Sequence, residues 1–416
     1  MRRRFYLHCV GSPHSSYPER ALLLAGEGDA VCVPRPVDSD YLGFLAGLGL
    51  GPRPEHIVVA GGGGRGAGRT LAERLLGEPA VLCRAARALG ADEVTIEPYA
   101  ATTDVMALAE VMEREAGIPV RMDGSPRITR YADQKHHMRA KAQELGIPVA
   151  EGEVAELAHP GGRRRRDLEP VRAAIERQLR RSARVIVRGS SGASGSFTFV
   201  VGRGGEDTSG ILRRIAQRAD NRFYLIEAMV EATVSPNVQI HIPPDDGPLV
   251  CTGITDQRWS RGLTHVGNQV PSSARTVEAM EAWARVLANW MRGQGYAGLV
   301  GFDFVEYRDP VTGGHRAMLA EVNPRVNGCT YPLAVRARLK SPAFFSGTVA
   351  TRAASFARVK AAIGHLLFDP GRGTGVVPYA TGCLEDGNCS LVALARSRLR
   401  AAELYGAAQA RLEAAA

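Results

Sequence analysis

Residues 301–325 contain two strand-like runs on either side of a turn-forming stretch at residues 309–314. Asp303 and Glu321 are equally distant from the centre of this turn, so they lie opposite each other if the segment is an antiparallel hairpin. Asn323 follows Glu321 by two residues and therefore shares its face. The alternate positions carry the apolar side chains that a core face needs: Val300, Phe302, Phe304, Ala320 and Val322. The segment predicts a hairpin with one buried face and one face that carries three polar oxygen ligands.

Two carboxylates and an amide oxygen in one patch are the ligands that Mg²⁺ prefers, usually together with substrate phosphates. Asp303, Glu321 and Asn323 are therefore candidate metal ligands. An exposed hairpin with solvated acids is the alternative interpretation, because carboxylates are common on hairpins.

A second segment reads as a strand, a small-residue loop and another strand, at residues 184–188, 189–196 and 197–201. Small residues let backbone N–H groups approach phosphate oxygens, and serine hydroxyls add donors. A Walker loop would lead into a helix and end in Gly-Lys-Ser/Thr, and this segment has neither feature. It predicts a hairpin loop that covers phosphates, with a flexible linker as the alternative.

Together the two segments resemble the ATP-grasp ligases, in which an Asp and a later Glu-x-Asn pair hold two Mg²⁺ ions. The resemblance implies that Asp303, Glu321 and Asn323 bind the metal. It also implies that Arg325, two residues after the Asn, stabilises charge on the transferred phosphate. The family usually has lysine before the glycine-rich loop, whereas this chain has Arg188, which keeps the charge but changes the contact geometry.

The same resemblance implies a set of ATP-binding residues. Lys135 stands where a helix is expected from Asp133 to Leu145, and only four of the 52 basic residues in the chain are lysines. It would bind near the α-phosphate, and an ordinary surface lysine is the alternative. The purine would lie near Glu227, Met229 and Val230, with Glu231 or Asn237 at the ribose. The loop contributes Ser190, Ser191, Gly192, Ala193, Ser194, Gly195 and Ser196.

The chain's 416 residues fit two or three domains, with a ligand cleft between them. Alternating short strands and helices predict a doubly wound α/β domain at 1–125. We expect an α/β multidomain protein: a preATP-grasp domain, an ATP-grasp core at 126–335 and a small, mainly helical C-terminal domain at 336–416. The core divides into a small lobe at 126–222 and a large lobe at 223–335.

This order of domains is most similar to the pheganomycin-type peptide ligases. In that family a nonproteinogenic amino acid is activated as an acyl phosphate and joined to the N-terminal amine of a peptide, with ATP converted to ADP. The resemblance implies Lys135, Arg188 and Arg325 as catalytic residues, a small carboxylate donor and an amine or peptide acceptor. A single-amino-acid ligase and a non-catalytic ATP-binding protein are the alternatives, and a homodimer is left open.

Composition narrows the classes of protein further. No apolar run approaches the roughly 20 residues that span a bilayer, so we expect no membrane segment. The net charge of +9 is spread along the chain, and the one dense basic run, at 163–166, is flanked by glycine without aromatic residues, so we expect no nucleic-acid partner. Seven scattered cysteines without a CxxC pair indicate reduced thiols and a cytoplasmic location. The basic N-terminus reads as a first strand rather than a signal peptide.

Two other glycine-containing segments are poorer candidates for sites. The run at 61–68 follows a strand and precedes a helix, as a dinucleotide loop does, but no convincing acid follows about 20 residues later. Residues 267–269, Gly-Asn-Gln, are predicted to be a plain turn, with a place beside the substrate as the alternative.

Overall fold

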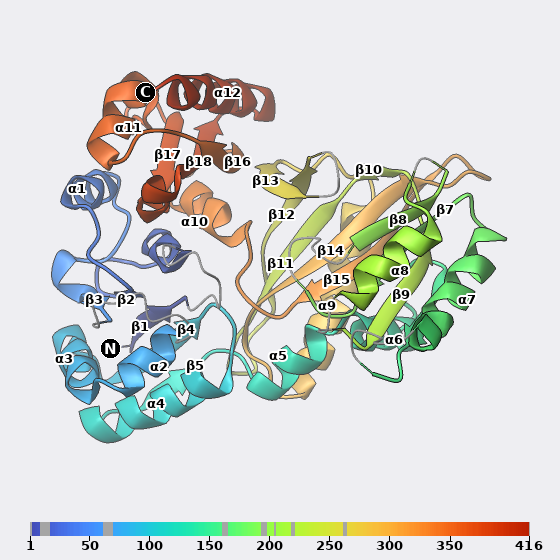
Figure 1. Cartoon of the computed structure of the whole chain (residues 1–416). Helices are drawn as coiled ribbons and strands as arrows, with labels where there is room; N and C mark the ends of the chain where they lie inside the picture. The colour runs from blue at the N-terminus through green and yellow to red at the C-terminus, as the bar shows by residue number, and fades with distance from the viewer. Residues whose placement is uncertain are drawn as a thin grey trace.

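The structure is a computed structural model of the chain, and its helices and strands form three sheets with their covering helices (Figure 1). It describes residues 2–8, 17–60, 70–159, 165–192, 198–203, 205–217, 221–260 and 264–415. The glycine run at 61–68, loop residues Ala193, Ser194, Gly195 and Ser196, and positions 163 and 164 of the arginine run lie outside these ranges.

The N-terminal part is a parallel sheet with strand order β3-β2-β1-β4-β5, as the alternating pattern predicts. Its strands are β1 (Arg2–Leu7), β2 (Ala30–Val33), β3 (Ile57–Val59), β4 (Glu93–Pro98) and β5 (Val120–Met122). Its helices are η1 (Tyr17–Leu23), α1 (Ser39–Gly47), η2 (Pro54–His56), α2 (Leu71–Leu76), α3 (Pro79–Leu89) and α4 (Thr103–Ala116). Residues 71–89 form two helices, because α2 ends at Gly77 and Pro79 starts α3.

A four-stranded antiparallel sheet with order β6-β9-β7-β8 follows. Its strands are β6 (Gly152–Glu156), β7 (Arg184–Gly189), β8 (Thr198–Gly202) and β9 (Phe223–Ala228). The helices of this part are α5 (Pro126–Ala132), α6 (Lys135–Glu144), η3 (Arg165–Leu168), α7 (Glu169–Leu179) and α8 (Thr208–Ala216). The expected helix over 133–145 is α6, but Asp133 ends α5 and Gln134 is the N-cap of α6. The strand-loop-strand prediction is confirmed by the β7–β8 pair.

The nine-stranded sheet has the order β10-β14-β11-β12-β13-β16-β18-β17, with β15 paired to β14. Its first six strands in the chain are β10 (Ala232–Val234), β11 (Pro236–Ile242), β12 (Val250–Trp259), β13 (His265–Val270), β14 (Gly298–Arg308) and β15 (His315–Asn323). Helix α9 (Val277–Gly293) covers one face, where its Leu287 and Met291 share a core with Val300 and Phe302. Asp303 is the ladder partner of Glu321, as predicted, but the register shifts by one residue between Asp303 and Phe304, so Phe304 pairs with Leu319. Ala320, predicted on the core face, lines a cavity instead.

The C-terminal segment contains more strand than predicted. Strands β16 (Ala343–Ala350), β17 (Gly375–Tyr379) and β18 (Asn388–Ala395) extend the large sheet. Helices α10 (Thr330–Arg338), α11 (Phe356–Ile363), η4 (Gly364–Leu366), η5 (Thr381–Asp386) and α12 (Arg398–Ala414) surround them. Residues of β18 are almost wholly buried, so they lack the polar alternation that marks a half-exposed strand. This segment shares one hydrophobic core with α1 of the N-terminal part, through Tyr41 and Phe356.

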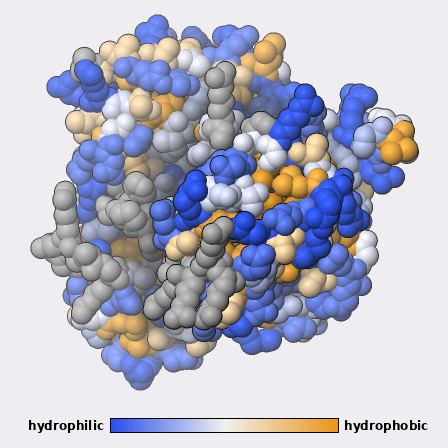
Figure 2. All heavy atoms as spheres, turned by 45° about the vertical axis from the view of Figure 1, so that its right-hand side comes forward, coloured by the Kyte–Doolittle hydropathy of each residue, from blue (hydrophilic) through white to orange (hydrophobic). Residues whose placement is uncertain are grey.

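The face of the molecule drawn in Figure 2 is mostly polar. In Figure 2 hydrophilic residues dominate the visible face, and hydrophobic residues gather in a limited area right of its centre. Among the described residues, no helix combines the length and apolar character needed to cross a bilayer.

Gly267 in β13 provides a test of how the C-terminal strands join the sheet. Its φ is +156°, and a Cβ at this position would collide with the carbonyl oxygen of Ser346 on β16. We expect Gly267→Ala to lower the free energy of unfolding by about 1–3 kcal/mol, because backbone must move to accept the methyl group. Gly293→Ala is the control, since a Cβ there has no atom within 4 Å. Equal stability of the two variants in denaturant unfolding would contradict this packing.

Candidate nucleotide and metal site

The predicted metal ligands are brought together at the β14–β15 ladder. The Nδ2 of Asn237 donates to Oδ1 of Asp303 at 2.6 Å, and the Nδ2 of Asn323 donates to Oδ2 at 2.8 Å. Gln257 also donates to Asp303. Burial and the nearby charge of Glu321 raise the pKa of Asp303 to about 7. A cation between the two carboxylates would offset the repulsion between Asp303 and Glu321.

This donor set fits Mg²⁺. In the part of the chain that the structure describes, no three His, Cys, Asp or Glu side chains gather as a metal cage. Magnesium does not need such a cage, because it commonly takes one or two carboxylates and completes its shell with phosphates and water. Asn323 bonds to Asp303 through its amide nitrogen and not through its carbonyl oxygen. Asp303, Glu321 and Asn323 together can therefore hold the ion.

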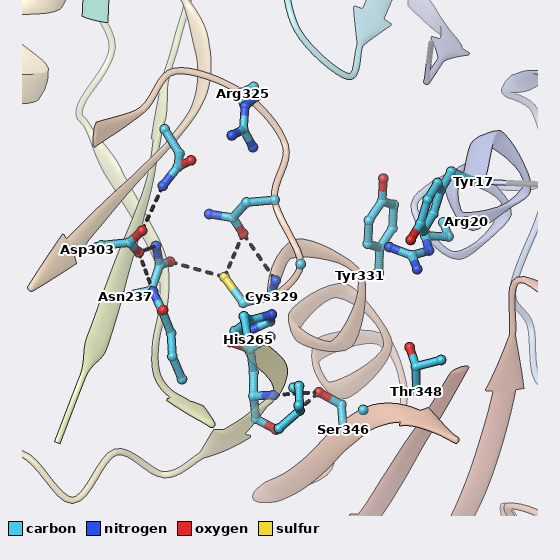
Figure 3. A pocket seen from close by; sticks show the side chains of 18 of the residues that line it. Tyr17, Arg20, Asn237, His265, Asp303, Arg325, Cys329, Tyr331, Ser346 and Thr348 are labelled. Carbon is cyan, nitrogen blue, oxygen red and sulfur yellow. Dashed lines mark hydrogen bonds between the residues drawn. The ribbon is translucent and has the colours of Figure 1, made fainter. Parts of the chain in front are cut away.

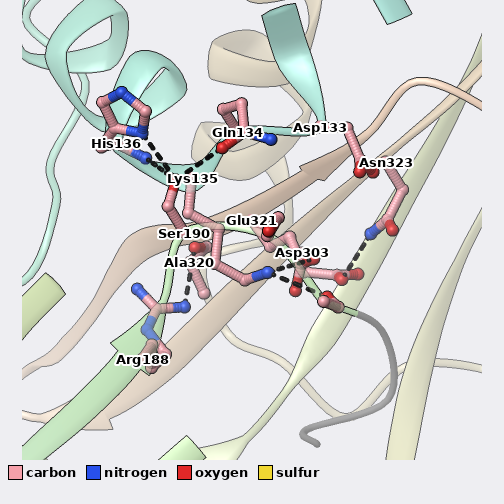
Figure 4. A network of polar contacts seen from close by, with 12 residues as sticks. Asp133, Gln134, Lys135, His136, Arg188, Ser190, Asp303, Ala320, Glu321 and Asn323 are labelled. Atoms are coloured by element: carbon pink, nitrogen blue, oxygen red, sulfur yellow. Dashed lines mark hydrogen bonds and ion pairs between the residues drawn. The ribbon is translucent and has the colours of Figure 1, made fainter. Parts of the chain in front are cut away.

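Lys135 lies directly beside these carboxylates (Figure 4). Its Nζ is 3.0 Å from Oε1 of Glu321 and donates to the carbonyl oxygen of Gly192 at 3.2 Å. Its backbone N–H donates to the carbonyl oxygen of Ser190 at 3.0 Å. Lys135, which is predicted to bind phosphate, thus connects the start of α6 with Ser190 and Gly192 of the loop and with the carboxylate pair.

The serines at the start of the loop have partners within the protein. Oγ of Ser190 lies 2.5 Å from Nδ1 of His136 and donates to Gln134 at 3.2 Å. The backbone N–H of Ser191 donates to Oδ1 of Asn221 at 2.7 Å, and its hydroxyl donates to the same oxygen at 2.9 Å. Ser190 and Ser191 therefore fix the loop to α6 and to Asn221. His136 and Asn221 were not predicted in this role, since nothing in their local sequence indicates the loop as partner.

Arg188 is held by a buried carboxylate. Its Nη2 is 2.6 Å from Oε2 of Glu227, and its Nη1 donates to the carbonyl oxygen of Ala320 on β15 at 2.9 Å. The other oxygen of Glu227 accepts from Arg139 at 2.8 Å, and Glu227 is only 2% exposed. Glu227, predicted beside the purine, thus anchors two guanidinium groups. Arg139 was missed, although its place four residues after Lys135 on the same helix face was a usable signal.

A largely apolar cavity of about 380 Å³ extends from these charged groups between the small lobe and the β14–β15 hairpin. Met229 and Val230 line it, as predicted for residues near a purine, and Lys135, Arg188, Ser191, Gly192 and Glu227 border it. Its other apolar lining residues include Ile186, Ala228, Phe304, Val305, Met318 and Leu319. Glu231 is exposed and does not border this cavity, and Asn237 lies against Asp303 instead.

A second and larger cavity of about 640 Å³ meets the first at Gln257, Trp259, Asp303 and Glu321. Its walls come from three parts of the chain (Figure 3). The N-terminal part provides Tyr17, Arg20 and Tyr99. Strand β13 provides His265, Gly267 and Asn268, and Arg325 follows β15. The C-terminal strands β16 and β17 provide Ser346, Thr348 and Tyr379. Residues 267–269 therefore belong to strand β13 and not to the predicted turn, and Gly267 and Asn268 border this cavity.

Arg325 faces this larger cavity and is oriented by other segments. Its Nη1 donates to the hydroxyl of Tyr99 at 3.3 Å, and its Nε lies 3.8 Å from Oδ1 of Asp133. Its backbone forms an isolated bridge with Ala100. The predicted charge stabiliser thus borders the same space as Asp303 and Glu321, and residues of the N-terminal part hold it there.

The chain is similar to a known domain family and to solved structures. Residues 18–113 match the model of the Pre ATP-grasp domain family. No curated protein shows significant sequence similarity to the chain.

Solved structures match almost the whole chain. N5-carboxyaminoimidazole ribonucleotide synthetase from Thermus thermophilus is similar with a TM-score of 0.57 and 16% identity, covering 99% of this chain and 98% of that chain. The corresponding synthase from Aspergillus clavatus, in complex with ADP and 5-aminoimidazole ribonucleotide, has a TM-score of 0.55 and 13% identity, with coverages of 99% and 97%.

Biotin carboxylase from Campylobacter jejuni, solved as a β,γ-ATP complex, has a TM-score of 0.61 and 14% identity, covering 96% of this chain and 88% of that chain. At these identities the likeness concerns the fold. The chain has an ATP-grasp fold, and the family-model match at residues 18–113 agrees with it.

Proposed function

We propose that this chain is an ATP-dependent ligase that joins a carboxylate to an amine and releases ADP. One observation carries the proposal: Asp303 and Glu321 stand where an apolar cavity and a larger polar cavity meet. A nucleotide in the first cavity would present its terminal phosphate at the carboxylates, and a substrate in the second would reach the same point. The solved structures of similar fold include nucleotide complexes, which agrees with this use of the first cavity.

The residues of the first cavity suit Mg-ATP. Met229, Val230 and Phe304 offer apolar contact to a purine, while Lys135 and Arg188 border the end where phosphates would lie. Asp303, Glu321 and Asn323 would hold Mg²⁺, which offsets the charge of the phosphates when it is bound. Lys135 pairs with Glu321 in the structure, and a phosphate would provide a second anion for its ammonium group.

The reaction follows from the two cavities. The donor carboxylate in the larger cavity attacks the γ-phosphorus, the bond to the β-phosphate oxygen breaks, and ADP leaves. Arg325 stabilises the negative charge on the transferred phosphoryl group. A neutral amine then attacks the carbonyl carbon of the acyl phosphate, phosphate leaves with the bonding electrons, and the amine loses a proton. Enclosure by the lobes protects the acyl phosphate from water.

The resemblance to pheganomycin-type peptide ligases supports a finer proposal. The donor is a nonproteinogenic amino acid and the acceptor is the N-terminal amine of a peptide, in a cytoplasmic pathway of natural-product synthesis. A single-amino-acid ligase is the nearest alternative, because a cavity of about 640 Å³ accommodates either acceptor. A non-catalytic ATP-binding protein is the other alternative, and the complete set of metal-binding and phosphate-facing side chains argues against it.

Hydroxylamine trapping tests the acyl phosphate. The chain is incubated with Mg-ATP, hydroxylamine and a panel of amino acids and arylglycine-like acids, and the products are analysed by mass spectrometry. We expect an acyl hydroxamate together with ADP, because hydroxylamine replaces the acceptor amine. Formation of AMP instead of ADP would contradict the mechanism, and nucleotide binding without any product would favour the non-catalytic alternative.

Replacement of Arg325 tests its assignment. We expect Arg325→Ala to reduce kcat by about 10²–10³, since one charge stabiliser of a developing anion is typically worth that much. Arg316→Ala is the matched control. Arg316 lies on β15, its side chain is 60% exposed, and it pairs with Asp309 near the turn. Wild-type turnover in a folded Arg325→Ala protein would remove the residue from the mechanism.

A further inference from the structure

Arg20 lies in the wall of the larger cavity among aromatic rings (Figure 3). Its guanidinium carbon is 4.1 Å from the ring centre of Tyr17, 5.8 Å from that of Tyr379 and 5.9 Å from that of Tyr331. Rings that contact the faces of a guanidinium leave its N–H edge as the part that binds an anion. These tyrosines come from both ends of the chain, so only the folded protein assembles them around Arg20.

The surroundings of Arg20 provide no matching carboxylate. Among the described residues it forms no ion pair, and its Nε is buried without a hydrogen-bond partner. Its neighbour Glu19 is turned away, since Oε1 accepts from Thr381 and Oε2 accepts from the backbone of Gly382. Residues 9–16, which precede η1 in the chain and lie outside the described ranges, contain no Asp or Glu in their sequence. A partly buried cation without an anionic partner favours a ligand that carries one.

The charges of the larger cavity are separated. The acids among its described lining residues are Asp303 and Glu321, and Arg325 is near them. Figure 3 shows Arg20 and Tyr17 across the cavity from Asp303, with the neutral side chains of Ser346 and Thr348 at the wall between. A ligand that fills this space would therefore meet the reacting groups at one end and an isolated guanidinium at the other.

We propose that Arg20, enclosed by Tyr17, Tyr331 and Tyr379, binds the carboxylate of the acceptor substrate. The acceptor is then an amino acid or short peptide with a free C-terminal carboxylate, whose amine reaches the Asp303 and Arg325 end of the cavity. That the bound substrate is the acceptor rests on the proposed ligase function. Anion binding at Arg20 itself depends only on the residues described above.

Calorimetric titration of the full chain tests the site. Amino acids and a set of di- and tripeptides are titrated as free acids and as the matching C-terminal amides. We expect the free acids that bind to do so about tenfold or more tightly than their amides, because a charge-assisted hydrogen bond is lost in the amide. Arg20→Gln should bring this ratio near one, and Arg20→Lys should keep part of it.

Arg53→Gln is the control, because Arg53 lies in the same domain, is 54% exposed and pairs only with Glu27 among the described acids. It should keep the wild-type ratio, and both variants should bind Mg-ATP as the wild type does. Binding of no acid, equal affinity of acids and amides, or a preference that survives Arg20→Gln would overturn the site. An Arg20-dependent preference without ADP formation would keep the site and reject the ligase, whereas turnover without that preference would do the reverse.

Discussion

Repulsion between the carboxylates of Asp303 and Glu321 governs the organisation of the site. They are partners in the β14–β15 ladder, and Asp303 is withdrawn from water, so ionising both is unfavourable unless donors or cations lie close by. The surroundings provide both: amide groups donate to Asp303, and Lys135 pairs with Glu321. Lys135 also donates to carbonyl oxygens at the start of the β7–β8 loop, so the same residue contacts the carboxylate pair and the loop.

Arg188, which stands before the loop where lysine was expected, connects strand β9 with strand β15. The planar guanidinium of Arg188 contacts Glu227 on β9 and the carbonyl oxygen of Ala320 on β15 at the same time. The guanidinium reaches the two acceptors with different nitrogens, whereas a lysine would have to donate to both from one nitrogen. The opposite oxygen of Glu227 is taken by Arg139, so one buried carboxylate compensates two cations. The consequence is a fixed position for Arg188 at the border between the small lobe and the hairpin.

The sequence was sufficient to predict those contacts that local periodicity determines. Hairpin symmetry predicted the pairing of Asp303 with Glu321, and strand patterns predicted β7 and β8. It was insufficient where partners are distant in the chain, as with Tyr99 at Arg325 or Asn221 at Ser191. The C-terminal strands were not predicted because β18 is buried on both faces, and a continuous apolar run of that kind does not distinguish strand from helix.

The larger cavity depends on the C-terminal segment and the N-terminal part of the chain as much as on the strands that surround the smaller cavity. Strand β16 pairs with β13, which places Ser346 and Thr348 in the wall, and Thr381 of η5 donates to the carboxylate of Glu19. That contact fixes the helix η1 on which Arg20 lies. Meanwhile Tyr99, after β4, orients Arg325. The proposed substrate contact at Arg20 and the proposed charge stabiliser Arg325 therefore both depend on contacts between distant parts of the chain.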